Sequence, residues 1–142
     1  MRTRILLLTA LLIGACGCES TGERVAREQN REAEASGSPF RWKIDSYGGG
    51  TAMTRIMIPL PNGGTRAGPE LSADILRRIK TLESEKRLPA RKISEVRLLP
   101  DGREVWISED VRGIAYVVTL RASPAGGTDF SVSGPIFFSN HG

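Results

Sequence analysis

Apolar and polar side chains alternate in two short segments that precede the middle of the chain. Residues 40–45 read FRWKID, and residues 52–60 place three aliphatic side chains on one face. A period of two is typical of a β-strand with one buried face. Three glycines at residues 48–50 separate the segments. They predict a turn and not a phosphate-binding loop, because the lysine and helix start of such a loop are missing.

The period changes to that of a helix in residues 69–87. One apolar stripe recurs there at i, i+4, i+8 and i+11, with charged side chains on the far side. The stripe consists of Leu71, Ile75, Ile79 and Leu82. Pro69 suits the first helical position and Pro89 ends the pattern. We predict an amphipathic helix with one packed face and one solvated, charged face.

An Asp-Gly pair at residues 101–102 predicts a hairpin, because this dipeptide favours a two-residue type I′ turn. Closing that turn pairs Leu98 with Val105 and Val96 with Ile107. All four side chains then share one face, so turn chemistry and hydrophobic pattern agree.

Alternation continues in residues 114–120 and 130–138, where Gly134 and Pro135 predict a bulge. Four strands after one helix, joined by short turns, predict an antiparallel meander with the helix on one face. The two earlier strands are expected to extend the sheet or to pair across its edge. The predicted fold class is therefore α+β, with the helix on a mainly antiparallel sheet of five or six strands within residues 39–140.

Trp106 stands between Val105 and Ile107, so the predicted register turns it away from the core. If the outer face of the sheet is exposed, Trp106, Leu99 and Val117 form a candidate binding patch. If the first strands or the N-terminal segment cover that face, these side chains are buried. The sequence leaves both alternatives open.

The first sixteen residues have a different character. Two arginines precede a nine-residue, mostly apolar run at residues 5–13, and small residues follow. This layout is typical of a secretory signal peptide, and the run is far shorter than the about 20 residues that a membrane-spanning helix needs. The ending Ile13-Gly14-Ala15-Cys16 resembles the lipobox of bacterial lipoproteins.

That resemblance implies a diacylglycerol on the Cys16 sulfur and cleavage after Ala15, with acylation of the new amino group. The signal peptide would then span residues 1–15. In such proteins an Asp after the cysteine commonly marks retention at the inner membrane. Gly17 stands there, so the resemblance implies the outer membrane, facing the periplasm.

Residues 16–38 are expected to be a charged linker, or stalk, between the lipid and the domain. Val25 is the only sizeable apolar side chain in residues 19–38, and Ser20 with Glu23 has the spacing of a capping box. A helix here would be polar on all sides, as a spacer is. Cys18 is either part of a flexible tether or a thiol that joins another chain.

Charge gives little support to a nucleic-acid partner. The 142 residues include 20 basic and 16 acidic side chains, a net charge of +4. Removal of residues 1–15 takes two arginines away and leaves 18 basic side chains against 16 acidic, a net charge of +2. We expect membrane attachment through Cys16 and no nucleic-acid binding.

Few residues suit catalysis. His141 is the only imidazole and lies at the C-terminus, so no base stands ready beside a nucleophile. Glu104, Glu109 and Asp110 are the one basis for a hydrolase. We predict no enzyme, no cofactor and no metal site. The leading hypothesis is a non-catalytic, periplasm-facing module that binds an envelope protein or a cell-wall component. The alternative is a carrier of small apolar ligands with a pocket between helix and sheet.

Overall fold

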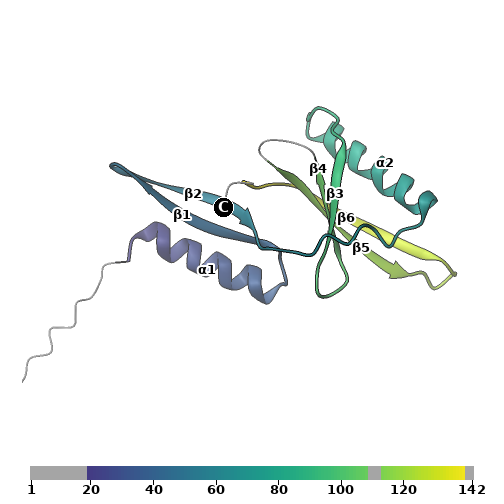
Figure 1. The fold of residues 1–142 in the computed structure, drawn as a ribbon, viewed down its shortest axis with the longest axis horizontal. Helices are drawn as coiled ribbons and strands as arrows, with labels where there is room; N and C mark the ends of the chain where they lie inside the picture. The colour runs from purple at the N-terminus through teal and green to yellow at the C-terminus, as the bar shows by residue number, and fades with distance from the viewer. Residues whose placement is uncertain (1–18, 109–112, 140–142) are drawn as a thin grey trace, which may run out of the picture.

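The computed structural model describes residues 19–108 and 113–139, which form two helices and six strands (Figure 1). In chain order these are α1 Thr21–Ala35, β1 Phe40–Tyr47, β2 Gly50–Met57, α2 Pro69–Glu85, β3 Ile93–Leu98, β4 Glu104–Ser108, β5 Ile114–Ala122 and β6 Thr128–Phe137. All strand pairs within the sheets are antiparallel. The α+β class is confirmed. The residues Cys16, Cys18, Glu109, Asp110 and His141 lie outside the described part of the chain, as does the predicted signal peptide.

The strands divide into two sheets instead of one. β1 and β2 form a hairpin of their own, and the second sheet has the order β3-β4-β5-β6. An isolated parallel bridge between Ile56 and Ser139 joins them, and the Ser139 N–H donates to the Arg55 carbonyl at 2.8 Å. The end of the last strand thus holds the hairpin beside the larger sheet (Figure 1).

The β3–β4 turn differs from the expected one by a single residue. The Leu99 N–H donates to the Arg103 carbonyl at 2.8 Å, and the Gly102 N–H donates to Leu99 at 3.0 Å. The loop therefore has three residues, with Pro100 in the second position of a type I turn and Gly102 at φ 91°. The predicted two-residue loop was wrong, because Pro100 belongs to the turn and not to the strand.

One extra loop residue changes which side chains share a face. Val96 lies opposite Trp106 and Arg97 opposite Val105. Trp106 consequently points toward α2, where only 3% of it is exposed. The helix packs on one face of the sheet as predicted, but that face is the Trp106 face and not the predicted Val105 and Ile107 face; its buried stripe includes Ile75 and Ile79.

The opposite face of the four-stranded sheet carries a second core. Leu99 and Val117 are buried there, under Phe40 of β1 and Phe138. The predicted patch of Trp106, Leu99 and Val117 is therefore not an exposed surface, and its members lie on two different faces. The cause is the β1–β2 hairpin, whose base covers the sheet from outside.

α1 is not a free stalk. Its capping box forms as predicted, with the Ser20 hydroxyl accepting from the Glu23 N–H at 3.2 Å. One side of the helix contacts β1, however, and Ala26 is buried against it. A small side chain permits close approach between helix and strand. The expectation of a helix solvated on all sides was thus wrong on this side.

Candidate interaction surface

Unpaired strand edges are the usual places where a sheet can accept a further strand. The two sheets of the described residues have four outer edges, and they differ in how they are covered: the β2 edge meets Ser139 at an isolated bridge with Ile56. The edge of β3 is closed by the segment that follows β2. The Leu98 N–H donates to the Pro61 carbonyl at 3.1 Å, and the Gly63 N–H donates to Val96 at 3.4 Å. These bonds occupy two of the groups that β3 would offer to another chain.

A side chain of α1 covers the outer edge of β1 at one position, Trp42. The Asn30 amide donates to the Trp42 carbonyl at 2.9 Å and accepts from the Trp42 N–H at 2.6 Å. The amide thus makes the two bonds that a neighbouring strand would make. The sequence does not predict this role, because nothing in the local pattern distinguishes Asn30 from the other polar residues of the helix.

The edge of β6 is open over residues 128–132. The Ser123 N–H donates to the Gly127 carbonyl at 3.0 Å, which fixes the alternation of bonded pairs along β5 and β6. By that alternation the N–H and C=O groups of Thr128, Phe130 and Val132 point outward. Within the described residues, the Thr128–Val132 part of β6 pairs with β5 and with no other strand. We call this row of groups the β6 edge.

A shallow depression of about 270 Å³ adjoins the β6 edge. Its lining residues are Arg121, Ala122, Pro124, Asp129, Phe130 and Ser131. A cation and an anion, Arg121 and Asp129, are therefore available within one small site, whereas the Phe130 ring packs with the α2 core cluster. A strand added at the β6 edge could place one polar or small apolar side chain there, because alternate side chains of an added strand point to the same face.

Glu104, the one described member of the acidic trio, is fully buried. Its carboxylate accepts from the Thr65 hydroxyl at 2.7 Å, the Arg66 N–H at 2.7 Å and the Trp106 indole N–H at 2.9 Å. Such a carboxylate ties the segment after β2 to the sheet. Its enclosure gives no support to a hydrolase that uses Glu104 as an acid.

A second buried acid belongs to α2 itself. Glu83 is 2% exposed and accepts a hydrogen bond from the Tyr116 hydroxyl at 3.2 Å. Burial, followed by the negative charge of Glu83, raises the pKa of Tyr116 far above its ordinary value. The phenol therefore stays protonated near neutral pH and remains a hydrogen-bond donor to Glu83.

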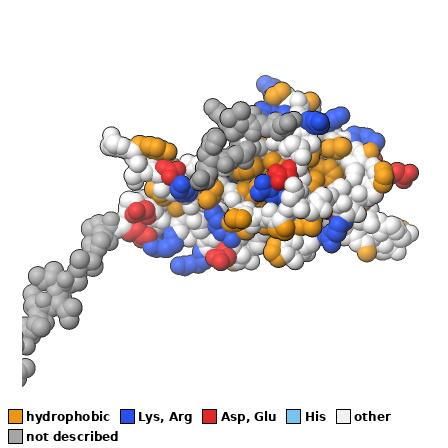
Figure 2. Space-filling model, viewed as in Figure 1, with side chains coloured by type: hydrophobic (Ala, Val, Ile, Leu, Met, Phe, Trp, Pro, Cys, Tyr) orange, Lys and Arg blue, Asp and Glu red, His pale blue; other side chains and the backbone are white. Residues whose placement is uncertain are grey.

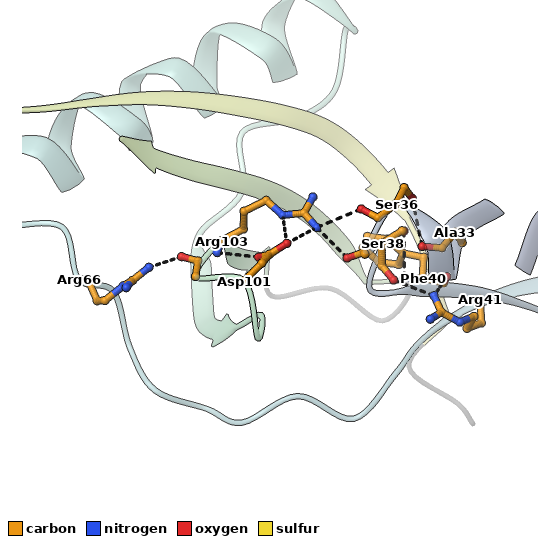
Figure 3. Close-up of polar contacts among 10 residues, drawn as sticks. Ala33, Ser36, Ser38, Phe40, Arg41, Arg66, Asp101 and Arg103 are labelled. Atoms are coloured by element: carbon orange, nitrogen blue, oxygen red, sulfur yellow. Dashed lines mark hydrogen bonds and ion pairs between the residues drawn. The ribbon is translucent and has the colours of Figure 1, made fainter. Parts of the chain in front are cut away.

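Arg103 joins the two parts of the fold (Figure 3). Its guanidinium pairs with Asp101 at 2.7 Å and donates to the Gly37 carbonyl at 2.7 Å. The hydrogen bonds from Arg103 hold the pKa of Asp101 below its ordinary value. This contact fixes the end of α1 to the β3–β4 turn, so α1, the hairpin and the sheet are connected at more than one point.

The interface of α2 with the sheet is filled by side chains that are almost completely buried. They are Ile75, Ile79, Leu82, Trp106, Ile114, Tyr116 and Val118. A different hollow, of about 460 Å³, lies between α1 and β1, and charged side chains of α1 form much of its lining. Neither feature favours a carrier of apolar ligands.

Comparisons with models of protein families, with curated proteins and with solved structures find no match to this chain. Over residues 19–108 and 113–139, no helix has the length and apolar character needed to cross a membrane. The same residues contain no cluster of three or more His, Cys, Asp or Glu side chains suited to a metal ion.

Proposed function

We propose that this chain is a bacterial lipoprotein, attached by lipid on Cys16 to the outer membrane and facing the periplasm. The carrying observation is Ile13-Gly14-Ala15-Cys16 behind two arginines and an apolar run. Each buried CH₂ contributes about 0.8 kcal/mol, and one acyl chain holds only marginally, so the two or three chains of a lipoprotein give stable attachment. Gly17 in place of Asp favours the outer membrane.

The folded part is proposed to be a non-catalytic interaction module for an envelope protein. The β6 edge supports this, because its outward groups at residues 128–132 pair with no other described strand, whereas the β1 and β3 edges are partly covered. A partner with an extended segment would add a strand there through main-chain hydrogen bonds. The depression beside Phe130 would then select one of its side chains.

The anchor is tested by mass spectrometry of the mature protein. We expect an N-terminus at Cys16 that carries diacylglycerol and an acyl chain. Cys16→Ala should abolish both lipid and membrane attachment, whereas the matched Cys18→Ala should leave them unchanged. An unmodified N-terminus, or lipid lost with Cys18→Ala, would contradict the assignment.

The interaction module is tested by placing a photo-crosslinking amino acid at one of two exposed positions of the membrane-attached protein. Thr128 lies on the β6 edge, and Lys80 lies on the solvated side of α2. Irradiation of cells should give a recurrent crosslinked product from position 128 and none from position 80. Equal products from both positions, or none from position 128, would count against the β6 edge.

A further inference from the structure

The folded part begins very close to the proposed lipid. Four residues, 17–20, separate Cys16 from the first residue of α1. Because an extended chain spans at most about 3.6 Å per residue, Ser20 can lie no more than about 14 Å from Cys16. If Cys16 carries lipid, as proposed above, the start of α1 must therefore stay near the bilayer surface.

The tip of the β1–β2 hairpin lies at the same end of the molecule as the start of α1 (Figure 1). A Cβ atom added to Gly22 would be 3.7 Å from the Ile44 side chain, which places these two residues side by side. β1 runs three residues further, to Tyr47. At about 3.4 Å per residue, the tip extends about 10 Å along the strand beyond Ile44.

The tip is uncharged and carries two exposed apolar side chains. Residues 46–53 read SYGGGTAM and contain no Lys, Arg, Asp or Glu. Tyr47 is 66% exposed and Met53 38% exposed. They stand on opposite faces, since Met53 lies opposite Ile44 while Tyr47 lies opposite Gly50. A Cβ on Gly48 or Gly49 would meet no atom within 4 Å, so the turn projects freely.

We propose that the tip of the β1–β2 hairpin, with Tyr47 and Met53, enters the head-group region of the bilayer that holds Cys16. Tyrosine suits that region, because its ring is apolar and its hydroxyl can stay hydrated. The exposed backbone of the glycine turn is also tolerated in the head-group region, because its polar groups can stay hydrated there. In Figure 2 the charged side chains are set back from the outer end of this hairpin.

Charge does not oppose this placement. Residues 19–27 carry Glu19 and Glu23 against Arg24 and Arg27, and near the tip Lys43 pairs with Asp45 at 3.4 Å. The end that meets the membrane is thus neutral overall, so anionic lipid neither repels it nor attracts it strongly. The short tether supplies the proximity, and the apolar tip supplies the contact.

This placement orients the molecule relative to the membrane. The β5–β6 turn lies at the opposite end from the hairpin tip (Figure 1). With the tip at the membrane, that turn and the adjacent β6 edge face away from it. A partner in the periplasm could then reach the edge, although the tether itself is short.

Spin-label depth measurements test the proposal on the full, lipid-modified protein in vesicles of phosphatidylethanolamine and phosphatidylglycerol. Cys18→Ser removes the second thiol, and the lipid blocks the Cys16 sulfur. Tyr47→Cys then places a nitroxide at the tip, and Ala125→Cys places the control in the β5–β6 turn. Both positions are exposed, so neither label disturbs the core.

We expect the label at position 47 to collide with oxygen, which concentrates in lipid, and to lose its collisions with a water-soluble nickel complex. The label at position 125 should show the reverse. Equal nickel access at both positions would overturn the proposal. Shielding of position 47 from both reagents would also overturn it, because that result indicates a protein contact.

The measurements distinguish a wrong assignment of the lipid anchor from a wrong assignment of the tip contact. Protein that does not float with the vesicles and lacks lipid on Cys16 would overturn the proposed lipoprotein and the tip contact together. Protein that floats with lipid on Cys16, but whose position 47 stays open to nickel, would overturn the tip contact alone.

Discussion

Replacing Glu104 with alanine is expected to lower the free energy of unfolding by about 4 kcal/mol, because removal of one partner leaves buried polar groups without their bonds. The indole N–H of Trp106 and the backbone N–H of Arg66 both lose their acceptor. The Glu104 side chain is fully buried, and so is its hydrogen bond from the indole N–H. Urea unfolding monitored by tryptophan fluorescence measures the loss.

Glu95 provides the matched control. It lies on the neighbouring strand β3 and pairs with Arg97 at 2.8 Å, but its side chain is 27% exposed. Partly exposed pairs of this kind contribute at most about 1 kcal/mol, so Glu95→Ala should have a small effect. Glu104→Gln should fall between the two, because the amide keeps one acceptor oxygen. Similar losses for Glu104→Ala and Glu95→Ala would show that the buried network is not a principal support of the fold.

Gly134→Ala is expected to lower the free energy of unfolding by about 3 kcal/mol, through backbone strain and a steric clash together. Gly134 has φ 135°, a conformation that side chains disfavour. A Cβ there would lie 2.9 Å from the Ala115 carbonyl oxygen and 2.9 Å from the Tyr116 ring. The same unfolding experiment measures the change.

Gly127→Ala separates strain from clash. Gly127 also has a positive φ, 84°, but a Cβ there would meet no atom within 4 Å. We expect a loss of about 1 kcal/mol, from backbone conformation alone. If Gly134→Ala were no worse than Gly127→Ala, the close packing of β6 against Tyr116 would not be a real constraint.

The sequence predicts the bulge at Gly134 correctly but gives the β3–β4 turn one residue too few. Both features depend on glycine and proline. The β5–β6 register shifts between Ala115 and Val117, as a bulge requires. At the other turn, Asp101-Gly102 matched a two-residue loop equally well by pattern. Only Pro100, whose fixed φ suits the second position of a type I turn, indicated the longer loop.

The sequence contains one indication of the second core, which the alternating pattern later in the same strand obscures. β5 begins with five consecutive apolar residues, Ile114 to Val118, and becomes alternating only from Thr119 onward. A continuous apolar run is typical of a strand buried on both faces. The covered half of the outer face corresponds to that run, and the polar half to the alternation.

The sequence by itself determined the elements and their order, because hydrophobic periodicity, caps and turn residues act within a few positions of the chain. It also supplied the lipobox, which stays a prediction. The tertiary structure alone decided which strand edges are covered and which strands are buried on both faces. Asn30 covers β1, residues 61–63 cover β3, and Phe40 covers the outer face of the sheet. Each of these contacts joins segments distant in sequence, so no local pattern could specify it.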